Sequence, residues 1–193
     1  LAANVVRLGI SYNSFDVLEE GYGINLRPLS DFAARVYHDD PCEHFQPHVL
    51  DENQYDPVDI PLAAKMHKAM VILQLKLEGQ LIHRHSEYHM DDWLLLEKIN
   101  FEDGTIEIDG TCYPLLDTNF PTVNPHDPLK LTREEQELSN SLVSSFLHSP
   151  RLQEHIHYLY SKGGMYLRMN SNLLYHGCIP LNEDGSFAVL PKK

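Results

Sequence analysis

The sequence of 193 residues has little basic charge, few cysteines and no long apolar run. Its 15 Lys and Arg stand against 28 Asp and Glu, giving a net charge of −13, and the basic residues form no cluster. A nucleic-acid partner needs clustered cations to displace counterions, so none is expected. No apolar run approaches the ~20 residues that cross a bilayer, so no membrane role is expected either.

The three cysteines, Cys42, Cys112 and Cys178, are widely spaced and form no CxxC pair. This pattern argues against a disulfide framework or a cysteine-based zinc site and favours a reducing, cytoplasmic compartment. The opening LAANVVRLGIS lacks the basic-then-apolar layout of a signal peptide. Both the opening and the closing FAVLPKK look like elements cut midway, so we expect the chain to be an internal segment of a larger protein.

Apolar periodicity predicts a mixed α/β fold, with residues 1–193 forming a single partial domain. Apolar residues recur at three- and four-residue steps after Asp59, which predicts a capped helix that packs against more than one neighbour and ends near HRH. Alternation around two Asp-Gly turns predicts a small antiparallel meander. The expected order begins with a helical part over about 1–90. It contains helices at 2–12, at 26–38 and from Asp59, and a loop at 41–57. The meander at 94–116 and a connector at 117–128 come next, followed by helices over 131–162 and sheet strands over 165–190.

The later helices carry clear start signals. Thr132 with Glu135 predicts a capping box, and Ser149 followed by Pro150 predicts the start of the next helix. The residues expected to face the core are Leu138, Leu142, Val143 and Phe146 on the first of these helices and Leu152, Ile156, Leu159 and Tyr160 on the second. The expected strands are 165–170, 172–176 and 186–190.

Twelve histidines are the compositional oddity. His83, His85 and His89 give H-x-H-x3-H, but on a helix residues 83 and 85 project about 200° apart, so a solvated helix end is favoured over a zinc site. His155 and His157 are also two residues apart on a predicted helix, so they too project about 200° apart and are not expected to share an ion.

His176 lies at the carboxyl end of a predicted strand, where open α/β sheets place ligands, and Gly177 would let a substrate or an ion approach. The chemistry of the residues alone still favours a structural histidine here. A Cys–His pair of Cys178 with His176 would have to converge in space, and Asp91-Asp92 reads more simply as a loop cap than as an acid–base pair.

Four stretches resemble one family along nearly the whole chain: KLEGQLIHRH, TCYPLLDTNFPT, MYLRMN and SNLLYHGCIPLNEDGSF. They resemble the class III fructose-1,6-bisphosphatases of bacteria, which belong to the calcineurin-like metallophosphatases. LLYHGCIP is also similar to the Val-His-Gly-Gly-Leu-Ser-Pro segment of Ser/Thr protein phosphatases. The resemblance implies a part of a metallophosphatase-type α/β sandwich in which His176 ligates one ion of a two-metal site, with Mn²⁺ as the usual metal.

The same resemblance implies hydrolysis of the 1-phosphate of fructose 1,6-bisphosphate by a two-metal-activated water, a step of gluconeogenesis. The family's Asp-x-His, Gly-Asp-x-x-Asp-Arg-Gly, Gly-Asn-His-Asp and Gly-His motifs are absent from these residues, so the segment by itself is expected to be inactive. No catalytic or substrate-contacting residue is assigned.

Two alternatives remain open at this point. LLYHGCIP alone would also suit another calcineurin-like phosphoesterase or a protein phosphatase, although residues 59–113 resemble the bisphosphatases specifically. A non-catalytic helical interaction module with an acidic surface would need no metal. Strands 165–176 are expected to be central in the parent sheet, so in the segment their unpaired edges favour self-association.

Overall fold

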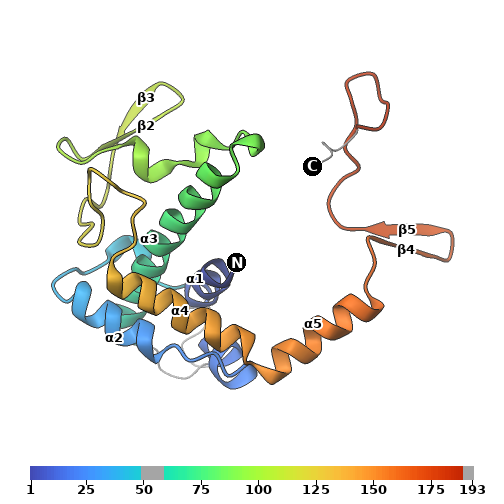
Figure 1. Ribbon diagram of the computed structural model, residues 1–193, viewed down its shortest axis with the longest axis horizontal. Helices are drawn as coiled ribbons and strands as arrows, with labels where there is room; N and C mark the ends of the chain where they lie inside the picture. The colour runs from blue at the N-terminus through green and yellow to red at the C-terminus, as the bar shows by residue number, and fades with distance from the viewer. Residues whose placement is uncertain (49–58, 189–193) are drawn as a thin grey trace. The chain divides into compact units, whose positions relative to one another are not determined.

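The computed structural model describes residues 1–48 and 59–188 (Figure 1). Helices combine with two small antiparallel sheets, which confirms the predicted mixed α/β fold. The chain separates into two compact units, Leu1–Leu152 and Gln153–Lys193, and each is described by itself. The part of the predicted 41–57 loop from residue 49 onward lies outside the described residues.

The first unit is built around the long helix α3 (Ile60–Arg84). The helices α1 (Ala2–Ser11) and α2 (Arg27–Val36) pack against it, and the largest apolar cluster lies among them. All three helices confirm the sequence prediction within two or three residues. Short helical turns lie between these helices at Val17–Gly21 and Glu43–Phe45. Three more follow α3, at Ser86–Tyr88, Asp91–Trp93 and Leu95–Lys98.

Helix α3 begins where the sequence predicts. The Asp59 carboxylate Oδ1 accepts a hydrogen bond from the Leu62 N–H at 3.0 Å, which satisfies one of the free donors of the first turn. Buried residues occur on several of its faces, including Met70, Ile72 and Leu73, so the helix packs against more than one neighbour.

The predicted meander is present as β1 (Ile99–Asn100), β2 (Thr105–Ile108) and β3 (Thr111–Pro114). The strands pair antiparallel in the order β1-β2-β3. Both expected turns are confirmed, because Gly104, Asp109 and Gly110 all have positive φ, at 65°, 51° and 73°. The chain then runs through the connector, which spans residues 115–131 and so includes the predicted 117–128.

Helix α4 (Arg133–Leu147) follows the connector and begins with the predicted capping box. Thr132 Oγ1 accepts from the Glu135 N–H at 3.1 Å, and the Glu135 carboxylate accepts from the Thr132 N–H at 2.7 Å. The expected inner stripe is only partly correct. Leu138 and Leu142 are buried and Phe146 is half-buried, but Val143 is 45% exposed because α4 packs through a narrow face and Val143 lies beside it.

Replacing Thr132 with Ala is expected to lower the free energy of unfolding by about 1 kcal/mol, because one N-terminal donor of α4 loses its acceptor. Urea unfolding followed by circular dichroism measures the change. Thr132→Ser keeps the hydroxyl and should stay close to the original protein. Equal losses in the two variants would show that the hydroxyl does not cap the helix.

The second unit contains most of α5 (Pro150–Lys162), followed by the hairpin of β4 (Tyr166–Met169) and β5 (Asn172–Tyr175). Ser149 Oγ accepts from the Leu152 N–H at 3.3 Å, as predicted for the start of α5. The predicted inner stripe is wrong for three of its four positions, which are 40%, 62% and 87% exposed at Ile156, Leu159 and Tyr160. The hairpin is likewise exposed, because no second layer covers these elements among the described residues of this unit.

The predicted strands 165–170 and 172–176 are confirmed as this hairpin. Asn170 and Ser171 form its turn, both with positive φ. The predicted strand 186–190 is not found in its described part, where a single bridge joins Leu181 and Phe187. Residues 189 and 190 lie outside the described residues.

Candidate metal centre

His176 directly follows β5, which confirms its predicted position at a strand end. Its neighbour Gly177 has φ +86°, a left-handed conformation that favours glycine, and a Cβ there would meet no atom within 4 Å. The space beside Gly177 is therefore open. Both residues are exposed, so the imidazole of His176 is accessible to an ion from outside the hairpin.

The described residues do not assemble a complete metal site around His176. Within residues 1–48 and 59–188, no group of three or more His, Cys, Asp and Glu side chains could hold a metal ion. A structural or catalytic zinc ion takes at least three protein ligands. The donor set of the described residues therefore does not form a dinuclear metal centre, and His176 would supply one ligand to such a centre.

The histidines of the H-x-H-x3-H stretch make separate contacts at the end of α3. His83 Nε2 lies 2.9 Å from Glu97 Oε1, and His85 Nδ1 lies 3.0 Å from Glu87 Oε1. His89 lies beyond the helix with φ 51°. The two carboxylates are different, so these histidines do not converge on one point.

The other sequence candidates have structural surroundings. Asp91 and Asp92 lie in a short helical turn, and the Asp92 carbonyl accepts from Lys98 Nζ at 2.9 Å. Cys178 is a free, exposed thiol. The Asp pair thus forms part of a turn, as the sequence favours.

The strongest electrostatic feature was not found from the sequence: a fully buried lysine in the first unit. Lys68 Nζ lies 2.6 Å from both Asp40 Oδ2 and Asp117 Oδ2, and its side chain is 0% exposed. The rings of Tyr37, Phe45 and Phe120 lie 5.5–5.8 Å from the ammonium, within cation–π range, so two carboxylates and three aromatic rings surround one cation.

A second buried lysine lies two turns further along α3. Lys76 Nζ donates to both carboxylate oxygens of Glu135, at 3.0 and 2.7 Å, and to the Thr122 carbonyl at 2.6 Å. Glu135 is 2% exposed and also closes the capping box of α4. Both ammonium groups are paired with protein acceptors, two for Lys68 and three for Lys76, so their role is structural: they hold other segments against α3.

The surroundings of Lys68 shift the pKa of neighbouring groups. Burial alone would raise the pKa of Asp40, but hydrogen bonds from Lys68 Nζ and the Cys42 N–H outweigh it and hold that pKa below its usual value. Burial, followed by the nearby Asp40 carboxylate, raises the pKa of the Cys42 thiol to about 12. The thiol of Cys42 is therefore protonated and unreactive at neutral pH.

The lowered pKa of Asp40 predicts a specific acid sensitivity. A carboxylate with a folded-state pKa below its unfolded value stabilises the protein above the unfolded pKa of about 3.9, and this contribution is lost as pH falls through the folded pKa. Unfolding free energy measured from pH 6 to pH 2 should therefore fall less steeply at the acid end in Asp40→Asn. Asp39→Asn is the matched control, because that side chain is 86% exposed. If the unfolding free energy falls equally steeply at low pH in Asp40→Asn and in the original chain, the pKa of Asp40 is not lowered in the folded protein.

A sequence signal for the buried lysines does exist. Lys68 and Lys76 are eight residues apart, so they lie on one face of α3, in the middle of an apolar helix. Cations at such positions require acidic partners. Their partners are 28 to 59 residues away in the chain, and no local sequence pattern identifies them as partners of these lysines: Asp40, Asp117 and Glu135.

Comparison with known proteins now identifies the family. The model of the Firmicute fructose-1,6-bisphosphatase family matches residues 1–192. Similar proteins named fructose-1,6-bisphosphatase class 3 come from Clostridium tetani (55% identical over 188 residues, 97% of this chain), Alkaliphilus metalliredigens (54%, 96% of this chain) and Listeria innocua (52%, 96% of this chain). No solved structure matches.

The chain therefore belongs to the Firmicute fructose-1,6-bisphosphatase family, as the resemblance in the sequence indicated. It spans 28% of the length of each of these three relatives. The family implies a divalent metal cofactor. No helix among the described residues is long and apolar enough to cross a membrane.

Proposed function

We propose that the protein of which this chain is a part hydrolyses the 1-phosphate of fructose 1,6-bisphosphate, in gluconeogenesis and in the cytoplasm. The observation that carries the proposal is the family match over residues 1–192 together with relatives of that name. The free thiols Cys112 and Cys178, both exposed, support a reducing compartment.

His176 is the proposed metal ligand of this segment. Three features support it: the strand-end position, the exposed imidazole and the open space beside Gly177. Mn²⁺ is the proposed metal, since mixed imidazole and oxygen ligation suits it. The remaining ligands would come from the rest of the longer protein, because the described residues offer no further cluster.

The substrate proposal is tested on the full-length protein supplied with Mn²⁺. Phosphate release should be far faster from fructose 1,6-bisphosphate than from fructose 6-phosphate or a phosphoserine peptide. Preference for the peptide would instead support a protein phosphatase. The 193-residue chain, assayed in parallel, is expected to release no phosphate and to show no tight stoichiometric Mn²⁺ binding by calorimetry. Tight binding by this chain would contradict the one-ligand assignment.

Self-association of the segment is also proposed. Each strand of the β4–β5 hairpin is paired on one side only among the described residues, and side chains on both faces, such as Tyr166 and Leu167, are exposed. Unpaired edges with apolar faces favour pairing with another copy. Light scattering of the 193-residue chain should show a mass that rises with concentration, and a monomer at high concentration would count against it.

A further inference from the structure

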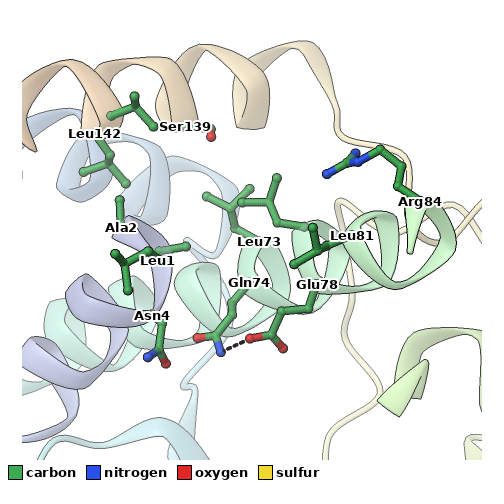
Figure 2. Close-up of a pocket in the computed structure, with 13 residues that line it drawn as sticks. Leu1, Ala2, Asn4, Leu73, Gln74, Glu78, Leu81, Arg84, Ser139 and Leu142 are labelled. Carbon is green, nitrogen blue, oxygen red and sulfur yellow. Dashed lines mark hydrogen bonds between the residues drawn. The ribbon is translucent and has the colours of Figure 1, made fainter. Parts of the chain in front are cut away.

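The groove between α1, α3 and α4 is an unreactive part of the first unit (Figure 2). It has a volume of about 300 Å³, and none of the described residues that line it is a cysteine, a histidine or an aspartate. Its polar side chains Gln74 and Glu78 are already bonded to each other, with Gln74 Nε2 donating to Glu78 Oε1 at 2.6 Å. Two groups that can react with each other lie elsewhere in the unit, in the turn between β2 and β3 (Figure 1).

Three aspartates among the described residues are followed directly by glycine: Asp103, Asp109 and Asp184. In such a pair the backbone nitrogen of the glycine can attack the aspartate side chain, because glycine has no side chain of its own to shield that nitrogen. Each of these glycines is followed by a threonine or a serine, so the local sequences are nearly the same. The difference in reactivity between the three pairs must therefore come from the fold.

The Asp103 pair is held in place on both sides. Asn100 Nδ2 donates to Asp103 Oδ2 at 2.7 Å, and Asn100 Oδ1 accepts from the Asp103 N–H at 3.2 Å. Gly104 is half-buried, and its carbonyl accepts from the Leu115 N–H at 2.9 Å. A Cβ at Gly104 would also meet Thr118 Cγ2 at 3.0 Å, so this turn has little room to rearrange.

The Asp184 pair is exposed, but both of its reacting groups are engaged. Asp184 Oδ1 accepts from the Ser186 hydroxyl at 2.6 Å and from the Ser186 N–H at 2.9 Å. These hydrogen bonds hold the pKa of the Asp184 carboxyl below its usual value, and an ionised carboxylate is a poor target for a nucleophile. The Gly185 N–H donates to the Asn182 carbonyl at 2.9 Å, so the attacking nitrogen is also occupied.

The Asp109 pair has neither restraint. Among the described residues no group hydrogen-bonds the Asp109 carboxylate or the Gly110 N–H, and both residues are exposed. A Cβ at Gly110 would meet no atom within 4 Å. Asp109 has φ 51°, a conformation that is unfavourable for a residue with a side chain. Every residue of β3 is exposed, so local opening of this turn exposes little additional apolar surface and should be frequent.

We propose that Asp109 is a site of spontaneous isoaspartate formation. When the turn opens, the Gly110 nitrogen attacks Cγ of the protonated Asp109 carboxyl group and forms an N–Cγ bond. The carboxyl hydroxyl leaves with the amide proton as water, which closes a cyclic imide. Water then adds to the former backbone carbonyl and breaks its bond to the nitrogen, so the main chain now runs through Asp109 Cβ. The water lost in the first step is regained in the second, and no oxidant, metal or other reactant is needed.

The product changes the meander at a defined place. Ile108 and Thr111 are paired directly across the two-residue turn, and the isoaspartate adds one carbon to the backbone between them. The two-residue turn sets the register of the hairpin, so the longer connection should weaken the pairing of β2 with β3. The exposed isoaspartyl carboxylate would be a substrate for the class of protein carboxyl methyltransferases that use a sulfonium methyl donor.

The test uses the full-length protein and needs neither metal nor substrate, so its outcome is independent of the proposed function. The protein is kept for weeks in neutral, non-denaturing buffer and then digested. Electron-transfer fragmentation distinguishes isoaspartyl from aspartyl peptides and gives the isoaspartate fraction at each of the three sites. We expect a fraction at Asp109 several-fold above those at Asp103 and Asp184. An equal or lower fraction at Asp109 would overturn the proposal.

A parallel incubation in guanidinium chloride tests whether the fold causes the difference. In the unfolded chain the three pairs have nearly the same local sequence, so their isoaspartate fractions should become similar. If Asp109 leads by the same factor in denaturant, the fold does not select this site and the structural argument is wrong.

Asn100→Ala tests the restraint at Asp103 directly. This variant removes the side-chain bonds that Asn100 makes to the first Asp-Gly turn, so the isoaspartate fraction at Asp103 should rise several-fold. The fraction at Asp109 in the same sample is the internal control and should stay unchanged. An unchanged fraction at Asp103 would overturn the explanation that bonds to the carboxyl group and its turn suppress the reaction.

Discussion

Replacing Lys68 with Met is expected to lower the free energy of unfolding by about 3–5 kcal/mol, the usual cost of removing one partner of a buried ion pair. The methionine would fill much of the space, but Asp40 and Asp117 would remain largely buried at 7% and 17% side-chain exposure, facing each other without a cation. Urea unfolding of the 193-residue chain gives the change. A loss of this size is a large share of the stability of a typical domain.

Two further variants decide whether charge causes this loss. Lys65→Met removes a lysine one turn away on α3 whose ammonium only donates to the His38 carbonyl at an exposed site, so its cost should stay within about 1 kcal/mol. Adding Asp40→Asn and Asp117→Asn to Lys68→Met removes both unpaired charges and should recover part of the stability. If Lys68→Met costs no more than Lys65→Met, the buried cation is not what holds these segments together.

In the full-length protein, His176→Ala is expected to lower Mn²⁺-dependent phosphate release by more than ~100-fold, because loss of outer-shell partners alone often costs 10–100-fold and His176 is proposed to bind the metal directly. The apparent affinity for Mn²⁺ should fall in the same variant, and a higher Mn²⁺ concentration should restore part of the rate. Phosphate release titrated against Mn²⁺ separates these effects.

His157→Ala is the control for this experiment. His157 is an exposed histidine on α5 of the same unit, and it should leave both the rate and the Mn²⁺ dependence unchanged. A His176→Ala protein that keeps the original Mn²⁺ titration would show that another group fills the ligand position.

The elements that depend on local signals were predictable from the sequence. Asp59 caps α3, Thr132 and Glu135 cap α4, and the two Asp-Gly turns of the meander have positive φ, because each signal acts within a few residues. The strand end at His176 follows from the same local reasoning.

Features that depend on distant partners were not predictable. Helix α5 has the periodicity of a core-facing helix at Ile156, Leu159 and Tyr160. Periodicity identifies an apolar face but does not show which segment of the chain packs against it. The proposed metal centre has the same limitation. His176 is proposed as a ligand from its local motif, whereas residues 1–48 and 59–188 do not bring together three or more side chains that could hold an ion.

Side chains of α3 fix the path of the connector. Three α3 side chains hold it in order along the helix: Lys68 at Asp117, Lys76 at the Thr122 carbonyl and Gln80 at the Leu129 carbonyl, 2.7 Å away. Since the helix sets the distance between these points, the number of residues between them is constrained as well. Most surface loops tolerate insertions, but one added residue between 117 and 129 would have to bulge outward or break a contact. The connector therefore behaves as a segment of fixed length, in which individual residues can vary more freely than their spacing.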